Sequence, residues 1–257
     1  MSTVNLSLHG KVAVVTGGSK GIGRAIALAF AEYGADVAIA ARGVEALDCT
    51  RKEIEEHGRG ALAVQTDVAN APDLERLYAE VCEAFGGVDV LVNNAATGDE
   101  GRELAKLTRD EFDRVLSVNL WAAIRLSQLC RPSMQQRGGG TILNIVSNEA
   151  IRPLPGLGIY SPSKAALVNL TQMIAKEWAA DGIRALCIAP GLVRTELAAP
   201  LVKMVEEQGL RLNPLGAIGE PEDIAGLALF LASPAGRFAT ATTFVIDGGE
   251  MAAGPIG

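Results

Sequence analysis

Apolar runs alternate with amphipathic stretches from one end of the chain to the other. Seven of these runs are six to eight residues long and consist mostly of Val, Ile, Leu and Ala. They are residues 12–17, 36–41, 61–67, 88–94, 141–147, 183–190 and 242–247. A strand that is apolar at nearly every position is typical of a parallel sheet, because helices cover both of its faces. We therefore predict seven strands of one parallel sheet.

The stretches between these runs carry signals for the beginnings and ends of helices. Gly34 and Gly58 stand where a glycine commonly follows a helix. Residues 108–111, Thr-Arg-Asp-Glu, have the form of a capping box at the start of a long helix. Strands that alternate with helices build right-handed βαβ units. The predicted fold is α/β, one parallel sheet with helices on both faces, in a single domain over residues 1–257.

One segment interrupts this alternation. Residues 192–214 contain a spacing of Leu, Val and Met that suits an amphipathic helix. The segment follows the sixth predicted strand, at the carboxyl edge where doubly wound sheets bind ligands. Because lids are commonly inserted at this edge, we predict a lid at about residues 192–214.

Composition and charge exclude several classes of function. The chain has 257 residues, of which 49% are hydrophobic, enough for a large buried core. Its net charge of -7 is unlike that of nucleic-acid binders and disfavours an anionic membrane surface. The N-terminal residues lack an apolar signal segment, and no apolar run is long enough to cross a membrane. We expect a cytoplasmic protein without nucleic-acid or membrane partners.

Side chains suited to metal or hydrolytic chemistry are scattered. The four cysteines form neither a CxxC pair nor a Cys/His cluster, which predicts no metal site and no disulfide framework. His9 and His57 stand apart from any serine motif, so a Ser-His hydrolase is disfavoured.

A glycine-rich segment follows the first predicted strand and precedes a helical stretch. It reads Thr-Gly-Gly-Ser-Lys-Gly-Ile-Gly at residues 16–23. Gly17 permits a tight turn, Gly21 lets the backbone approach a pyrophosphate, and Gly23 lets the helix pack closely on the strand. The helix N-terminus then offers free N–H groups and positive dipole charge to phosphates. This context predicts a dinucleotide site, and the spacing does not match a P-loop.

The end of the second predicted strand bears on which dinucleotide binds. An NAD site usually has an acidic residue there, which binds the ribose diol. This chain has Ala40, Ala41 and Arg42 instead. A guanidinium can chelate a 2′-phosphate, and Lys20 in the glycine loop adds a second positive charge. We predict NADP(H) in preference to NAD; the other interpretation is that Arg42 is only a solvated loop residue.

Further motifs follow the glycine loop along the chain. They are Asn-Asn-Ala at 93–95, Asn119, Ser147, Tyr160-x-x-x-Lys164, Pro-Gly at 190–191 and Asp-Gly-Gly at 247–249. In their order and spacing, the chain resembles the short-chain dehydrogenase/reductase family over essentially its whole length. It is similar in particular to the single-domain branch of 3-oxoacyl carrier-protein reductases and related ketone or alcohol dehydrogenases.

The resemblance implies a sheet order, a reaction and a set of residues. The expected fold is a doubly wound Rossmann sheet with the strand order 3-2-1-4-5-6-7. The expected reaction interconverts a ketone, or a 3-oxoacyl-type carbonyl, and a secondary alcohol by hydride transfer. Tyr160 corresponds to the general acid/base and Lys164 to the residue that holds the nicotinamide ribose. Ser147 orients the substrate carbonyl, and Asn119 supports a water relay. The expected cofactor contacts are Gly17, Ser19, Lys20, Gly21, Ile22, Gly23, Arg42, Asp67, Val68, Asn93, Asn94, Ala95, Tyr160, Lys164, Pro190, Gly191, Val193 and Thr195.

Three positions depart from the family pattern. Ala96 stands where the Asn-Asn-Ala run normally continues with glycine, and Leu186 where asparagine is frequent. Thr240 and Ala241 replace the frequent Thr-Gly before the last strand. None of these is a catalytic group, so we expect effects on local packing.

The spacing of Tyr160 and Lys164 has a chemical rationale. Residues four apart share one face of a helix, so both side chains can reach one pocket. A free tyrosine has a pKa of about 10, and we expect the neighbouring ammonium to lower it. Each residue also has a purely structural interpretation when it is taken singly. Tyr160 and Lys164 could lie on a helix surface. Asn119 could be a hydrogen-bonded amide in the core, and Ser147 could cap the end of a strand.

Three segments are expected to line the substrate site, namely residues 97–104, 149–157 and 192–210. The predicted substrate contacts are Ser147, Glu149, Leu154, Tyr160 and Leu197. The pocket is therefore expected to be mainly apolar, with Glu149 as the exception. Glu149 either meets a polar or cationic substrate group or pairs with Arg152 outside the pocket.

Two other classes of function remain open at this point. One is a catalytically silent NADP(H)-sensing protein, which would not need the Tyr160 phenol. The other is epimerisation or dehydration on the same fold, which tends to use a longer C-terminal substrate domain than the eight residues after 247–249. The resemblance also implies a homotetramer or homodimer, with residues 110–131 and 161–178 as the candidate interface.

Overall fold

Seven parallel strands form the central sheet in the computed structural model, which describes residues 4–98 and 103–252. The strands are β1 (Val12–Thr16), β2 (Asp36–Ala41), β3 (Ala61–Gln65), β4 (Val90–Asn93), β5 (Gly140–Ile145), β6 (Ile183–Pro190) and β7 (Thr243–Ile246). Their order is β3-β2-β1-β4-β5-β6-β7, and every neighbouring pair is parallel. The predicted sheet and its order are confirmed.

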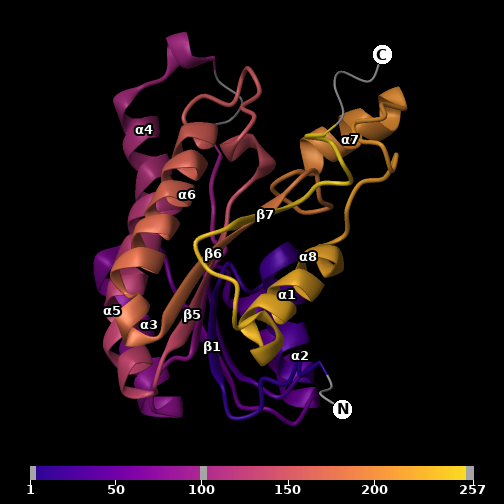
Figure 1. The fold of residues 1–257 in the computed structure, drawn as a ribbon. Helices are drawn as coiled ribbons and strands as arrows, with labels where there is room; N and C mark the ends of the chain where they lie inside the picture. Colours follow the sequence, from indigo (N-terminus) through magenta and orange to yellow (C-terminus); the bar gives the residue numbers. More distant parts are fainter. Residues whose placement is uncertain (1–3, 99–102, 253–257) are drawn as a thin grey trace.

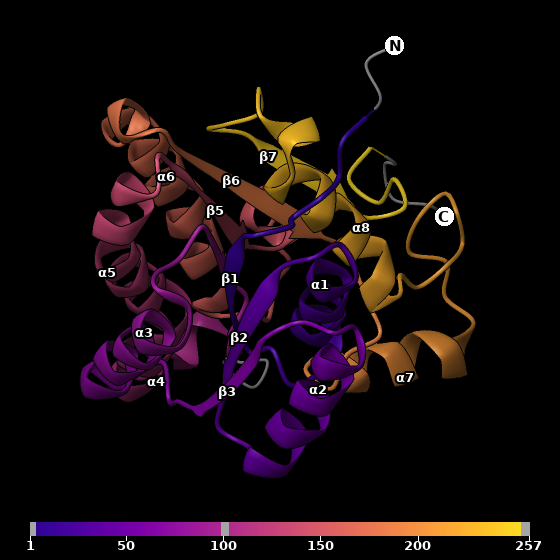
Figure 2. The same cartoon turned by 90° about the horizontal axis from the view of Figure 1, so that it is seen from below.

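Helices cover both faces of the sheet. Figures 1 and 2 show α3, α4, α5 and α6 on one face and α1, α2 and α8 on the other. The helices are α1 (Gly21–Glu32), α2 (Val44–Glu56), α3 (Ala71–Phe85), α4 (Arg109–Leu116), α5 (Ala122–Gln136), α6 (Tyr160–Glu177), α7 (Ala199–Gln208) and α8 (Pro221–Ala232). Within residues 4–98 and 103–252, no helix has the length and apolar character needed to cross a membrane.

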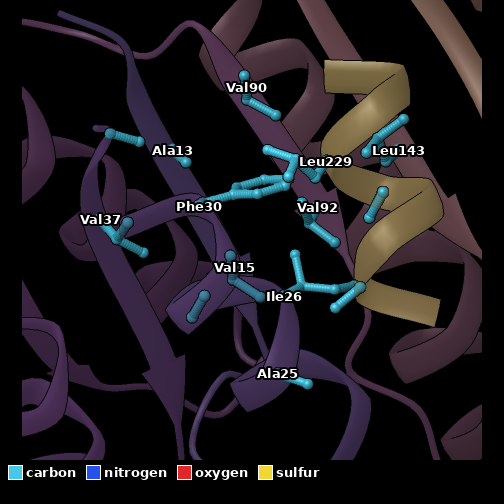
Figure 3. Packing of buried hydrophobic residues seen from close by; sticks show 14 of the residues in the cluster. Ala13, Val15, Ala25, Ile26, Phe30, Val37, Val90, Val92, Leu143 and Leu229 are labelled. Carbon is cyan, nitrogen blue, oxygen red and sulfur yellow. The ribbon is translucent and has the colours of Figure 1, made fainter. Parts of the chain in front are cut away.

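The apolar character of the strands follows from this double covering. Ala13 and Val15 of β1 point to one face, where they join Phe30 of α1 and Leu229 of α8 in one core cluster (Figure 3). Val12 and Val14 alternate with them and join the second cluster, which includes residues of α3, α5 and α6. A strand buried on both faces needs apolar side chains at odd and even positions alike.

Local signals for helix ends are reproduced in the structure. The Thr108 hydroxyl accepts a hydrogen bond from the Glu111 N–H at 3.3 Å, and the Glu111 carboxylate accepts one from the Thr108 N–H at 3.0 Å. This reciprocal pair is the predicted capping box. Gly34 and Gly58 follow the ends of α1 and α2 with φ of 100° and 69°. Both lie in the left-handed region, which glycine enters without a steric penalty.

The predicted interruption after β6 contains a helix. α7 lies beyond the sheet at the end where α6 begins (Figure 1). Val202 and Val205 are buried, and the backbone of Val193 pairs with that of Gly219 in an isolated parallel bridge. Residues 192–214 are therefore anchored beside the carboxyl edge of the sheet, where the candidate site lies.

Candidate active site

The loops after β1 and β4 meet at the point where the strand order reverses. The Asn94 side chain donates hydrogen bonds to the Thr16 carbonyl at 2.9 Å and to the Gly17 carbonyl at 3.2 Å. The Thr16 hydroxyl accepts from the N–H groups of Asn94 at 3.0 Å and Ala95 at 3.1 Å. These bonds hold the glycine loop and the 93–95 loop as one framework at the crevice where such sheets bind ligands.

The three glycines of the loop have distinct steric surroundings. Gly17 has a φ of 64°, which suits the turn after β1. A Cβ on Gly23 would lie 2.3 Å from the Gly17 carbonyl oxygen, so only glycine allows α1 to approach the loop this closely. A Cβ on Gly21 would lie 3.1 Å from Cγ2 of Thr195. The loop therefore lies against the segment after β6.

The beginning of α1 offers hydrogen-bond donors that the described residues do not use. The N–H groups of Gly21, Ile22 and Gly23 have no acceptor among these residues, and the N-cap residue Lys20 supplies no side-chain cap. Unpaired N–H groups at a helix N-terminus form a binding site for phosphate. The residues present thus fit the pyrophosphate of a dinucleotide.

The two predicted phosphate-binding cations differ in their surroundings. Arg42 is exposed just beyond β2, and its carbonyl accepts a hydrogen bond from the Gln65 side chain at 3.1 Å. Lys20 is exposed, but its ammonium lies 2.6 Å from Oε1 of Glu196 in the segment after β6. The Lys20–Glu196 ion pair therefore joins the glycine loop to the predicted lid.

The remaining predicted cofactor residues lie along the same carboxyl edge. The Ser19 carbonyl accepts from Thr50 of α2, and the loop after β3 places Asp67 in solvent and Val68 in the core. The Asn93 amide is bonded to Asn144 at 2.8 Å, which gives it a structural partner. The residues that end or follow β6 are Pro190, Gly191, the buried Val193 and Thr195.

The predicted catalytic residues come from β5 and α6. Ser147 follows β5, and its hydroxyl accepts a hydrogen bond from the Glu149 N–H at 3.2 Å in the short helix η3 (Asn148–Ala150). Tyr160 is the first residue of α6 and Lys164 lies one turn later. The Lys164 ammonium is 5.7 Å from the centre of the Tyr160 ring and donates to the Ile145 carbonyl at 2.8 Å. The fold brings the three side chains together.

Burial controls the protonation of both α6 residues. Burial, which has the largest effect, and the charge of Glu149 raise the pKa of Tyr160, while a hydrogen bond with Ser147 lowers it, and the resulting pKa is about 12. Burial lowers the pKa of Lys164 to about 8. The expected lowering of the Tyr160 pKa by Lys164 is wrong for the chain alone, because desolvation of the phenolate dominates and the ammonium is directed to a carbonyl.

Asn119 lies in a π-helical segment, η2 (Ser117–Trp121), between α4 and α5. Its side chain is 2% exposed, donates to the Thr97 carbonyl and the Ser163 hydroxyl at 3.0 Å each, and accepts from the Thr97 N–H at 2.9 Å. The amide is thus satisfied in the core, and it ties η2 to the loop after β4 and to α6. Single π-helical turns are frequent at functional sites.

The predicted substrate segments differ in how the structure presents them. Leu154 and Leu197 are 48% and 58% exposed, which is high for apolar side chains. Glu149 accepts a hydrogen bond from the Ser161 hydroxyl at 3.2 Å, a partner that the sequence did not suggest. Of the predicted segment 97–104, residues 99–102 lie outside the described residues.

Glu250 is a carboxylate beside the site that the sequence interpretation missed. Its pKa is raised above the usual value, chiefly by burial and also by the charge of Asp247. A hydrogen bond with Asn148 and the charge of Arg152 oppose this rise. A Cβ on Gly191 would lie 3.1 Å from its Oε2. Its only sequence signal is its position directly after the Asp-Gly-Gly motif, since no periodicity links it to the residues around Ser147.

Comparisons with known proteins identify a matching family model and related sequences. A family model described as Enoyl-(Acyl carrier protein) reductase matches residues 17–250. Dehydrogenase/reductase SDR family member 4 from Oryctolagus cuniculus is 37% identical over 244 residues, which cover 94% of each chain.

Two solved structures are similar over nearly their whole length. L-Sorbose reductase from Gluconobacter frateurii, complexed with NADPH and L-sorbose, has a TM-score of 0.92 at 32% identity and covers 96% of this chain and 99% of its own. A 7α-hydroxysteroid dehydrogenase complexed with NADH and 7-oxo glycochenodeoxycholic acid has a TM-score of 0.91 at 34% identity and covers 97% of each chain.

Proposed function

Since the chain belongs to the short-chain dehydrogenase/reductase family of oxidoreductases, we propose that it interconverts a ketone and a secondary alcohol with Tyr160 as general acid/base. One observation carries the proposal. Ser147, from the end of β5, meets Tyr160 and Lys164, from the start of α6, beside unpaired helix N–H groups. A regulatory protein that only sensed the dinucleotide would not need this phenol.

The cofactor site is proposed from this chain's own donors. The N–H groups of residues 21–23 would hold the pyrophosphate, and Lys164 would reach the nicotinamide ribose. A bound nicotinamide supplies a hydride when it is reduced and accepts one when it is oxidised.

The proton is moved by Tyr160. In reduction, its hydroxyl would donate a proton to the carbonyl oxygen, which Ser147 would orient. In oxidation, the phenolate would accept the alcohol's hydroxyl proton. A pKa of about 12 means that the phenol is protonated near neutral pH in the chain alone. This state suits reduction.

The preference for NADP(H) is supported by charge. Arg42 stands where NAD sites usually have a carboxylate, and it is exposed two residues after Ala40, whose carbonyl accepts a hydrogen bond from the Gly17 N–H at 2.7 Å. The two solved neighbours bind NADPH and NADH, so their likeness supports a nicotinamide cofactor without choosing between them.

The substrate class is a ketone or 3-oxoacyl-type carbonyl with apolar carbon beside it. Exposed Leu154, between Ser147 and Tyr160 in the chain, and exposed Leu197, in the segment after β6, support this class as apolar surface on the two predicted substrate segments. A homotetramer or homodimer stays a prediction, supported by exposed Trp121 and Met173 on the two candidate interface segments.

Replacement of Tyr160 by phenylalanine tests the function. We expect Tyr160→Phe to lower kcat/KM by about a hundredfold or more, because the proton donor is lost while the ring remains. The measurement is NAD(P)H absorbance over a panel of carbonyls and alcohols, run with both cofactors. Circular dichroism and NADPH binding should match the parent.

Two outcomes of this panel would contradict the proposal. A Tyr160→Phe variant as active as the parent would remove Tyr160 from the mechanism. A clear preference of the parent for NADH would contradict the role proposed for Arg42.

A further inference from the structure

Glu149 bridges the loop that carries Ser147 and the helix that carries Tyr160. Its N–H donates to the Ser147 hydroxyl at 3.2 Å, and its carboxylate accepts from the Ser161 hydroxyl at 3.2 Å. Ser161 is buried in the first turn of α6, directly after Tyr160. One residue therefore links the catalytic loop to the catalytic helix and brings a negative charge to the place where they meet.

Other charged or titratable groups come from α6, β6 and the segment after β7. On α6, the Lys164 ammonium is directed at the Ile145 carbonyl. Beyond β7, Glu250 is acted on by Asp247 and by Arg152 of the turn after η3. On β6, burial raises the pKa of the Cys187 thiol to about 11, so it is neutral in the working range. Glu149 is the carboxylate whose charge acts on Tyr160.

We propose that Glu149 is a positioning residue that keeps the Tyr160 hydroxyl protonated and so biases the site toward carbonyl reduction. This inference rests on the proposed function of Tyr160. A carboxylate close to a phenol opposes loss of the phenolic proton, because the product would be a second negative charge in a poorly solvated place. Burial acts in the same direction, which makes the two effects cumulative.

The consequence differs for the two directions of the reaction. Reduction needs the protonated phenol, which Glu149 favours over a wide pH range. Oxidation needs the phenolate to accept the alcohol proton. Because of the Glu149 charge, the Tyr160 phenol ionises only at higher pH. The hydride transfer itself is unchanged, since Glu149 acts only on the group that gains or loses the proton.

The test is the pH dependence of alcohol oxidation in Glu149→Gln. Glutamine keeps an oxygen acceptor for the Ser161 hydroxyl and removes the charge. We expect the rising limb of kcat/KM for oxidation, measured with saturating oxidised cofactor, to move to lower pH by about one unit. The high-pH decline of the reduction rate should move in the same direction, because both report the same phenol.

Two control variants separate charge from structure. Glu149→Asp keeps the negative charge. The rising limb of its pH profile for oxidation should therefore stay close to that of the parent, even if its kcat/KM falls. Glu55→Gln removes one charge from the exposed end of α2, where Glu55 pairs with Arg51, and should leave the profile unchanged.

The outcomes distinguish this inference from the proposed function. A Glu149→Gln profile that keeps the parent's limb, whether at full or reduced rate, overturns the inference and leaves the function of Tyr160 intact. A limb that moves equally in Glu55→Gln overturns it as well, because the effect would then be one of net charge. If Tyr160→Phe retains the parent's activity and profile, the proposed function itself fails.

Discussion

Lys164 places an ammonium where the protein interior disfavours charge. Its side chain is 2% exposed, and burial lowers its pKa to about 8. A hydrogen bond to the Ile145 carbonyl stabilises the ammonium only in part. A buried lysine without an anionic partner costs free energy of folding, so its presence here indicates a role in binding or catalysis.

We expect Lys164→Met to separate stability from activity. The kcat/KM should fall by about a hundredfold or more, because the residue proposed to hold the nicotinamide ribose is lost. The free energy of unfolding near neutral pH should not fall, since methionine fills the space without a charge. Urea denaturation and NADPH-linked assays would measure the two effects.

The pKa of Lys164 determines how the free energy of unfolding changes with pH. The pKa of Lys164 is about 8 in the folded chain and about 10.4 when unfolded, so the unfolded chain binds more protons between these values. The stability of the parent therefore rises through this window relative to the variant. A variant that is destabilised equally near neutral pH and at about pH 9.5 would show that the Ile145 hydrogen bond outweighs the cost of burial.

At the scale of elements, the sequence predicts the sheet well because burial on both faces leaves a continuous apolar signal. The bounds of β2 and β6 coincide with the predicted 36–41 and 183–190. The predicted 61–67 and 141–147 extend too far, since β3 ends at Gln65 and β5 at Ile145. The last residues of these runs belong to the loops at the carboxyl edge, and hydrophobicity does not mark where the hydrogen-bonded ladder stops.

The candidate site was predictable in its residue types and much less in its contacts. The family resemblance supplies Tyr160, Lys164 and Ser147, and the spacing of Tyr160 and Lys164 explains how both side chains can reach one pocket. The π-helical turn around Asn119 and the bond between Glu149 and Ser161 do not, because they depend on how separate elements pack. The pKa of Tyr160 was predicted in the wrong direction for the same reason, since desolvation is a property of the folded site.

Ala241 is strained in the turn before β7. Its φ of 56° lies in the left-handed region, where a Cβ is unfavourable, and it replaces the glycine frequent in the family. We expect Ala241→Gly to raise the free energy of unfolding by about 0.5 kcal/mol, because relief of strain exceeds the entropy that glycine adds to the unfolded chain.

A second alanine gives the control for this prediction. Ala79 is exposed within α3, where Ala79→Gly should lower the free energy of unfolding by about 1 kcal/mol. Urea denaturation of both variants provides the comparison. A loss of stability in Ala241→Gly similar to that in Ala79→Gly would show that the turn holds no strain.

At the scale of the whole molecule, a buried carboxylate and a partly buried guanidinium lie at the edge of the sheet opposite the candidate site. The site occupies the carboxyl edge, while Asp89 and Arg184 lie near the amino ends of β4 and β6. The Arg184 guanidinium is bonded to the Leu231, Gly236 and Ala239 carbonyls at 2.7–3.0 Å. It therefore ties the segment after α8 to the sheet, far from the groups that exchange protons with substrate.

Asp89 joins three parts of this amino edge. Its carboxylate, 3% exposed, accepts from the Val12 N–H at 2.9 Å, from Lys11 at 3.0 Å and from Arg137, after α5, at 2.7 Å. Burial alone raises its pKa, but the bonds from Arg137, Val12 and Lys11 outweigh it and hold the pKa below the usual value. The carboxylate therefore stabilises the fold in its ionised form.

We expect Asp89→Asn to lower the free energy of unfolding near neutral pH by about 2 kcal/mol, because Arg137 loses its buried anionic partner. A carboxyl whose pKa is lowered on folding contributes stability above its unfolded pKa of about 3.9 and loses it as the pH falls through the folded value. The difference between parent and variant should therefore shrink below about pH 4. Urea denaturation across this range measures it, with Asp113→Asn, an exposed carboxylate paired with Arg109, as the control. A difference that stays constant in acid would mean that Asp89 acts through packing and not through its charge.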